Sequence, residues 1–176
     1  MKIQLTSAIC AACVAFGAGV VLAAKDKGPG MELIRGKPAH EAGIASLQEA
    51  EKLAGSGSWE LLGVARVYFL SGDKSKGQAL IDRVLSSKPN SSDWFRIGQI
   101  YAEAGDNAKA EEYFTKALAA DPKDDTGHAE VGAWYLRHGD REKGEAELAK
   151  AFEKHPDEVW HYVRAAEGLL NVPPGH

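Results

Sequence analysis

Cysteine is almost missing from this sequence, and the two cysteines that occur stand close to its start. Cys10 and Cys13 have the CxxC spacing, but no histidine follows Cys13, which excludes the pattern that attaches haem. Both lie within an apolar segment that we expect to be removed from the mature chain. The remaining residues therefore offer no thiol for a disulfide bond or for a thiolate metal site.

The motifs of common enzyme chemistries are missing as well. The sequence contains no G-x-S-x-G, no Walker loop and no dinucleotide-binding glycine pattern, and its histidines show no HExxH spacing. Its acidic residues stand beside lysine and arginine on segments expected to face solvent, which favours a solvated surface over an acid/base pair. We therefore predict no catalytic residue, no metal site and no cofactor, and we expect that the protein is not an enzyme.

Long runs of like charge and long apolar runs are absent from residues 25–176. The net charge of the whole chain is −4, and basic and acidic residues are mixed throughout. This distribution gives no reason to expect a nucleic-acid partner or an acidic membrane surface. We also expect no membrane span once the first segment has been removed.

The apolar run that does occur lies at the N-terminus. Lys2 gives it a positive start, an almost uncharged stretch follows from Ile9 to Ala24, and Val21-Leu22-Ala23 closes it with residues that signal peptidase accepts. Residues 1–24 thus resemble a secretory signal peptide cleaved near Ala23 or Ala24. The alternative is an anchor that stays in the membrane, although the run is somewhat short for a bilayer span.

Cleavage just before Cys13 would instead produce a lipoprotein. The preceding Cys10-Ala11-Ala12 lacks the usual branched residue, and the apolar run continues well beyond Cys13. Lipidation is therefore disfavoured, and we predict a periplasmic or secreted protein of a Gram-negative bacterium.

The rest of the chain contains a short sequence motif, here called the phrase, that occurs three times. Gly-Asp, with a lysine three positions after the aspartate, starts at Gly72, Gly105 and Gly139, at intervals of about 34 residues. Self-similarity at this period is typical of stacked helical hairpins. Such a chain usually works by offering a surface rather than by performing chemistry.

The residues around the middle phrase have a specific spacing. Trp94, Ile97, Gly98 and Tyr101 read W-x-x-I-G-x-x-Y. Ala110, Phe114, Ala117 and Pro122 follow at fixed offsets, and the other two copies carry related residues at the same places: Leu61, Val64, Ala65, Tyr68, Gly77, Ile81, Val84 and Pro89, and His128, Val131, Gly132, Tyr135, Gly144, Leu148, Ala151 and Pro156. This pattern resembles the tetratricopeptide repeat, with Ile97 in place of the usual leucine.

The resemblance implies an all-α fold, a right-handed superhelix (α-solenoid) of about eight helices with a capping helix at each end. Each Gly-Asp phrase would lie between two paired helices, with the glycine ending the first and the aspartate capping the second. Small residues such as Gly98 and Gly132 allow the paired helices to approach closely. Large residues such as Trp94 and Tyr101 are expected to fill core positions between hairpins.

The chain divides accordingly. After the signal peptide we expect a flexible lead (residues 25–38) and then a repeat domain (39–171). The parts of this domain are a half-repeat (39–56), three repeats (58–90, 91–124 and 125–158) and a capping helix (157–171), and a short non-helical tail follows (172–176).

In the tetratricopeptide repeat family the first helix of each pair lines the concave surface, and its exposed positions contact partners. Carried over by offset, the candidate groove residues are Trp59, Leu62, Arg66, Phe69, Phe95, Arg96, Gln99, Ala133, Arg137 and Trp160. Trp59, Phe95 and Trp160 are off the scaffold positions and suit anchors for a peptide or helix. The alternative is that these aromatic residues pack against the capping helices or the lead.

The function implied is that of an exported adaptor or scaffold for protein–protein interaction, which binds a peptide or helix of an envelope partner in its concave groove. The arginines at positions 66, 96 and 137 would set the polarity of the bound segment. The alternative is a structural module that self-associates through its end or convex faces. We also consider that Met31, Leu33 and Ile34 of the lead lie in the protein's own groove or in a neighbour's.

Overall fold

The structure, a computed structural model, describes residues 28–175. The predicted signal peptide, its cleavage site and the first residues of the lead lie outside the described residues. The described part is entirely helical, so the prediction of an all-α fold with about eight helices is confirmed. Its elements are η1 (a 3-10 helix, Gly30–Leu33), α1 (Ala39–Ala54), α2 (Ser58–Leu70), α3 (Lys74–Leu85), α4 (Ser91–Glu103), α5 (Asn107–Ala120), α6 (Asp125–Arg137), α7 (Arg141–Lys154) and α8 (Val159–Leu169).

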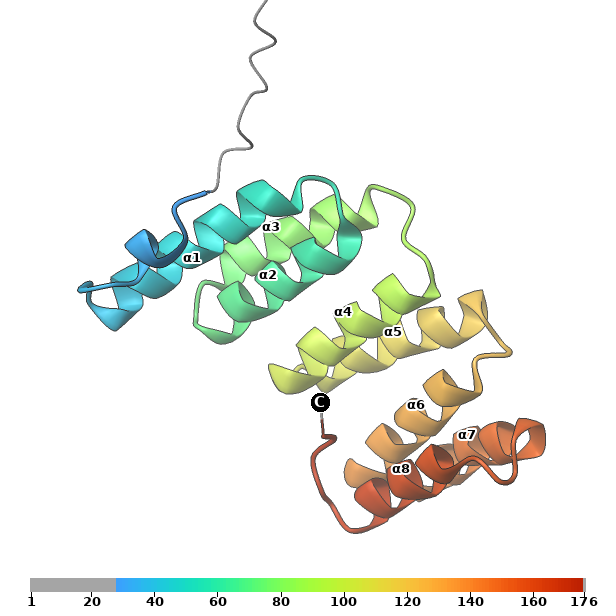
Figure 1. Cartoon of the computed structure of the whole chain (residues 1–176). Helices are drawn as coiled ribbons and strands as arrows, with labels where there is room; N and C mark the ends of the chain where they lie inside the picture. The colour runs from blue at the N-terminus through green and yellow to red at the C-terminus, as the bar shows by residue number, and fades with distance from the viewer. Residues whose placement is uncertain (1–27, 176) are drawn as a thin grey trace, which may run out of the picture.

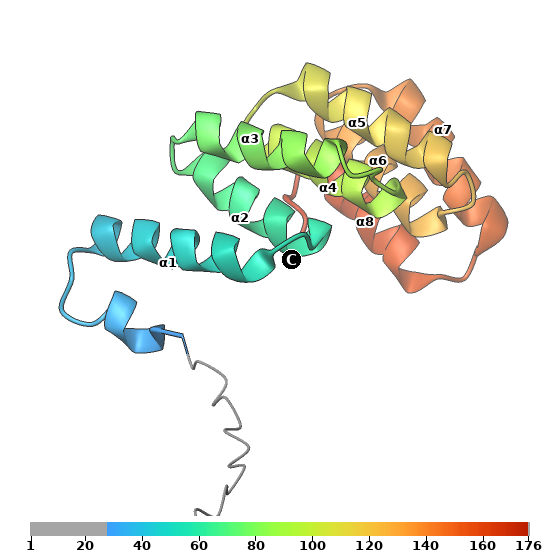
Figure 2. The ribbon, with the colours of Figure 1, turned by 90° about the horizontal axis from the view of Figure 1, so that it is seen from above.

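The helices are arranged as successive hairpins. α2 packs on α3, α4 on α5 and α6 on α7, and the three pairs follow one another through space (Figures 1 and 2). α1 packs against α2 at one end, and α8 packs against α6 at the other. The fold is thus the predicted α-solenoid, with a single helix covering each terminal hairpin as a stack of this kind requires.

The repeated phrase ends one helix and starts the next in all three copies. Gly72, Gly105 and Gly139 have φ angles of 104°, 79° and 82°, in the left-handed region that suits a glycine at a helix C-terminus. The following aspartates accept hydrogen bonds from backbone N–H groups three residues on: Asp73 from Lys76 at 3.2 Å, Asp106 from Lys109 at 3.2 Å and Asp140 from Lys143 at 3.1 Å. Both predicted roles of the phrase are confirmed.

The small residues lie where paired helices touch. A Cβ atom added at Gly132 would stand 2.9 Å from the carbonyl oxygen of Gly144 and 2.9 Å from the side chain of Leu148. At Gly98 an added Cβ atom would stand 2.6 Å from the ring of Phe114. No real Cβ atom is accommodated at these distances, so the close helix pairing depends on glycine at both positions.

Gly132→Ala is therefore expected to destabilise the protein, by about 1–3 kcal/mol, because the backbone of the neighbouring helix must move. Gly43→Ala on α1 is the matched control, since an added Cβ atom there meets no atom within 4 Å. Its expected effect is stabilisation by about 0.5–1 kcal/mol through helix propensity. Urea unfolding followed by far-UV circular dichroism measures both changes. Equal stabilities of the two variants would contradict the close approach at Gly132.

The core lies between successive hairpins. Tyr68, Ile97 and Tyr101 are almost completely buried, as predicted for scaffold positions. Trp94 is only partly buried, which corrects the expectation that it fills a core position. Its ring stacks on that of Tyr113 with 5.8 Å between centroids. The ammonium group of Lys116 lies over the Trp94 ring, 5.2 Å from its centroid.

The spacing of the inner helices is uneven along the stack. α2 packs against α4, whereas α4 and α6 do not pack closely on one another. The second and third hairpins are joined instead through α5 and α6, where the rings of Phe114 and Trp134 meet edge-on at 5.3 Å. Figure 1 shows the resulting separation between α4 and α6.

The lead begins with η1, which contacts α1. Met31 and Ile34 are 57% and 48% exposed, and in Figures 1 and 2 this segment lies at the opposite end of the solenoid from α6 and α8. The idea that the lead occupies the protein's own groove is therefore wrong. The reason is geometric, because α1 separates the lead from the inner helices that follow.

Candidate partner-binding groove

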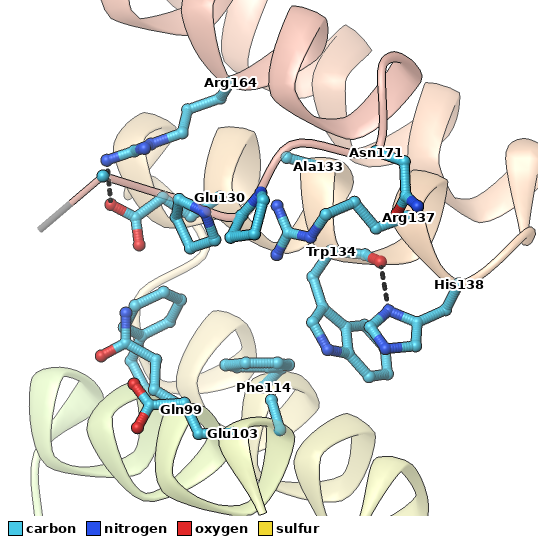
Figure 3. Close-up of a pocket in the computed structure, with 15 residues that line it drawn as sticks. Gln99, Glu103, Phe114, Glu130, Ala133, Trp134, Arg137, His138, Arg164 and Asn171 are labelled. Carbon is cyan, nitrogen blue, oxygen red and sulfur yellow. Dashed lines mark hydrogen bonds and ion pairs between the residues drawn. The ribbon is translucent and has the colours of Figure 1, made fainter. Parts of the chain in front are cut away.

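A cavity of about 540 Å³ opens between the second and third hairpins, where α4 and α6 are separated (Figure 3). Its walls come from the inner helices, from one ring of α5 and from the C-terminal tail. The lining residues are Phe95, Gln99, Ala102 and Glu103 of α4, Phe114 of α5, Glu130, Ala133, Trp134 and Arg137 of α6, His138 directly after α6, Arg164 of α8, and Asn171, Pro173, Pro174 and Gly175 of the tail. We call this cavity the groove cavity.

One wall of the groove cavity is a continuous row of aromatic rings. Phe95 and Phe114 lie 5.3 Å apart between centroids, and Phe114 meets Trp134 at 5.3 Å. The ring of His138 lies 4.5 Å from that of Trp134, and its Nδ1–H donates to the Trp134 carbonyl oxygen at 2.7 Å. These contacts hold the rings in place. Phe95 is partly buried, whereas Phe114 and Trp134 are 3% and 5% exposed and only border the cavity, so most of the accessible aromatic surface belongs to Phe95.

Phe95 is placed by the start of its helix. α4 begins with a capping box in which Asn90 and Asp93 exchange hydrogen bonds at 3.0 Å, each side chain accepting from the other's backbone N–H. Because this box fixes the first turn, the neighbouring Phe95 side chain is directed toward Phe114 and the cavity. The local sequence therefore determines the anchor's position.

Arg137 is the charged group of the groove cavity that lacks a partner. Its side chain points into the cavity in Figure 3, and it makes no hydrogen bond or ion pair with any residue of the described range 28–175. Burial lowers the pKa of this guanidinium, with the charges of Glu167 and Glu130 acting in the opposite direction. A partly buried cation gains most from a partner that supplies a carboxylate or carbonyl oxygen.

A second arginine at the cavity edge is already paired. Arg164 lies 2.7 Å from Glu167 and 3.5 Å from Glu130. Burial raises the pKa of Glu130, and the charge of Arg164 opposes that rise. The two arginines of this wall therefore differ, since within residues 28–175 Arg164 forms ion pairs and Arg137 forms none.

Four of the predicted groove residues come together around this cavity: Phe95, Gln99, Ala133 and Arg137. Leu62 and Phe69 do not, because their side chains are 0% and 7% exposed. The prediction of partner-accessible side chains is wrong for these two. α2 packs against α1, α3 and α4 at once, which leaves little of its surface open. Ala133 is also buried, under Gly168 of α8, so it contributes to the wall without projecting from it.

The remaining predicted residues of the first two hairpins have partners within the chain. The guanidinium of Arg96 lies 3.3 Å from the ring centroid of Trp59, a cation–π contact between α4 and α2. Burial lowers the pKa of Arg96, and the nearby charge of Arg66 adds to this effect. Arg66 itself donates from Nε to Glu103 at 2.6 Å. Trp59 is 61% exposed, so the larger part of its side chain faces solvent.

Trp160 lies apart from the other two predicted anchors. It is 62% exposed and borders a separate hollow of about 230 Å³ together with Asp125 and the buried His161. Trp59, Phe95 and Trp160 therefore do not form one aromatic strip. Of the three, only Phe95 lines the groove cavity.

Sequence reasoning missed two aromatic side chains and the tail. Phe114 was assigned to the scaffold, and it serves both the core and the cavity wall. Trp134 precedes the scaffold residue Tyr135, where the other copies carry Val67 and Ile100. That difference between copies was the available signal for Trp134. For the tail, the signal was the pair of prolines directly after the last helix.

Comparison with known proteins gives one family match within this region. Residues 92–124 match the tetratricopeptide repeat, which covers nearly all of α4 and the whole of α5, the helices on one side of the groove cavity. A comparison with curated proteins gave no match. None of the helices in residues 28–175 is both long and apolar enough to cross a membrane. A tetratricopeptide repeat supports a scaffold for protein–protein interaction, the role that such repeats typically serve.

Proposed function

We propose that this chain, built on a tetratricopeptide-repeat solenoid, is an exported adaptor that binds a peptide or helix of an envelope protein in the groove cavity between α4 and α6. The observation that supports this most directly is Arg137, a half-buried cation that makes no hydrogen bond or ion pair with residues 28–175, in a cavity bordered by aromatic rings. The proposal of export to the periplasm or the exterior rests on the signal-like residues 1–24.

The two kinds of wall suggest how a partner segment is held. Apolar side chains of the segment would contact Phe95 and the small parts of Phe114 and Trp134 that border the cavity, and an oxygen atom of the segment would pair with Arg137. The cavity of about 540 Å³ suits a short segment rather than a whole domain. A micromolar affinity, about −8 kcal/mol, is the expected strength.

Affinity capture from a periplasmic extract tests this function. Phe95→Ala bait is expected to retain about tenfold less partner than wild-type bait, because the exposed edge of the aromatic wall is lost. Leu53→Ala is the control, since Leu53 is 74% exposed on α1 and away from the cavity. Circular dichroism must show that both variants stay folded. Equal capture by the wild type and Phe95→Ala would exclude the groove cavity as the binding site.

One observation favours the alternative of self-association. α8 and the residue after it expose a cluster of large apolar side chains at the end of the stack: Val159, Trp160, Tyr162, Leu169 and Leu170. An uncovered apolar face on a terminal helix suits packing against a second copy. Light scattering over a concentration series separates the two functions, because a strict monomer at high concentration would exclude assembly through this face.

A further inference from the structure

The tail leaves α8 in a direction that a helix-capping motif determines. Asn171 has a left-handed φ of 55°, and its backbone nitrogen lies 3.4 Å from the carbonyl oxygen of Gly168. The backbone N–H of Val172 donates to the carbonyl oxygen of Glu167 at 2.9 Å. This pair of contacts is a Schellman motif, which reverses the chain at the end of a helix. Pro173 and Pro174 cannot resume a helix, so the tail continues as an extended segment.

The extended tail runs along the groove cavity. Asn171, Pro173, Pro174 and Gly175 all line it, facing α4 across the opening. In Figure 3 the ribbon of the tail passes between α6 on one side and α4 on the other. A segment of this chain thus already forms one wall of the cavity proposed for a partner.

The chemistry of the tail suits the wall that it faces. A pair of prolines favours the polyproline II conformation, which has no internal hydrogen bonds and loses little entropy on binding. Grooves lined by aromatic rings are the usual binding sites of such segments. The partly buried Phe95 supplies such a ring here, and the almost fully buried Phe114 and Trp134 border the same cavity behind it.

The tail is nevertheless held weakly. Each of its residues from Asn171 to Gly175 is exposed, and Val172 is 46% exposed. Its backbone hydrogen bonds to the rest of the described chain are the two of the capping motif, and these would remain if the prolines moved away. With the tail in place, Arg137 still has no partner within residues 28–175. A ligand with an oxygen atom that paired with this cation would therefore make a contact that residues 171–175 do not make.

We propose that the groove cavity recognises extended, proline-containing peptides with an acidic residue, and that residues 171–175, which border its opening, must move aside in cis before such a peptide binds. This inference deepens the proposed function. Its statement about the peptide partner rests on that function, whereas its statement about the tail does not. The apparent affinity for a peptide falls in proportion to the fraction of molecules with an open site. If the tail covers the site for about nine-tenths of the time, removing it raises the affinity about tenfold.

The experiment compares the full-length protein with a variant that ends after Val172, which keeps the capping motif and loses the prolines. The probes are a synthetic peptide of residues 170–176 and the same peptide carrying Gly175→Glu. Binding is followed through the indole N–H resonance of Trp134, which Trp134→Phe identifies. The indole nitrogen of Trp134 is buried without a hydrogen-bond partner in the described chain, so its signal reports on the cavity wall.

We expect truncation to shift the Trp134 resonance and the added peptide to return it toward the full-length position. The truncated protein should bind both peptides about three- to tenfold more tightly than the full-length protein. The Gly175→Glu peptide should bind more tightly than the parent peptide, and Arg137→Gln should remove this preference. A peptide in which both prolines are replaced by alanine should bind more weakly.

Two results would overturn the inference. The first is an unchanged Trp134 resonance and unchanged peptide affinity after truncation, which would mean that the tail does not cover the cavity. The second is a wild type that self-associates in light scattering while the truncated variant stays monomeric, which would place the tail in a second copy. None of these measurements uses an envelope partner, so a failed capture experiment and a failed tail experiment remain distinguishable.

Discussion

Replacing Tyr101 by alanine is expected to lower the free energy of unfolding by about 3–5 kcal/mol, the range found for large aromatic residues removed from a core. Tyr101 is 1% exposed and joins the first two hairpins. Its ring lies 5.4 Å from that of Phe69 on one side and 5.4 Å from that of Tyr113 on the other. Because no helix can close the space that remains without breaking these contacts, little of the loss should be recovered.

Tyr101→Phe is the control for this prediction. The hydroxyl group of Tyr101 donates to Gln78 on α3 at 2.6 Å, so the control loses one hydrogen bond and keeps the ring. Its expected cost is about 1 kcal/mol. Urea unfolding followed by far-UV circular dichroism gives both values. If the two variants were equally stable, the ring contacts between the hairpins would not be the main contribution of this residue.

Phe114→Ala is expected to have a comparable total cost, about 3–5 kcal/mol, and also to change the shape of the unfolding transition. Phe114 is 3% exposed and contacts Phe95, Trp134 and the position of Gly98. In a solenoid each hairpin is stabilised chiefly by its neighbours, so cooperativity depends on the interfaces between them. Since α4 and α6 do not pack closely, the junction that Phe114 supports has few other contacts to replace it.

Calorimetry measures this effect. The wild type is expected to unfold in one transition, and Phe114→Ala in two, because the third hairpin and α8 separate from the rest. Phe114→Leu keeps a branched apolar side chain and should keep a single transition with a lower midpoint. A single, cooperative transition in Phe114→Ala would mean that other contacts couple the two parts of the stack.

The repeat pattern predicted the scaffold well because each of its positions has a local or nearest-neighbour cause. The glycine and aspartate of the phrase at Gly105 and Asp106 act within a few residues, through a left-handed φ and a side-chain cap. Gly98 acts on the helix that follows it, at a fixed offset along the chain. Contacts of this kind recur with the repeat, so the sequence carries them three times.

The candidate site was predicted only in part, because it arises where the repeat is irregular. Leu62 stands at a position offset to the concave side, yet α1 and α4 both pack on its helix and the residue is buried. Trp134 borders the cavity because α4 and α6 are separated. This separation is a relation between two repeats, so the sequence of one repeat does not predict it. The tail at Pro173 depends on how the last helix ends, and a pattern derived from the middle of a stack does not include its end.

The loose junction between α4 and α6 has a mechanical consequence. A stack of hairpins bends most easily where adjacent inner helices pack least closely on one another. In this chain that weakest section coincides with the groove cavity. Bending there changes the width of the binding site at low energetic cost, and a segment clamped between the two sides would oppose the bending. A bound ligand would thus reduce bending between the second and third hairpins, and this effect would be detectable at both ends of the molecule.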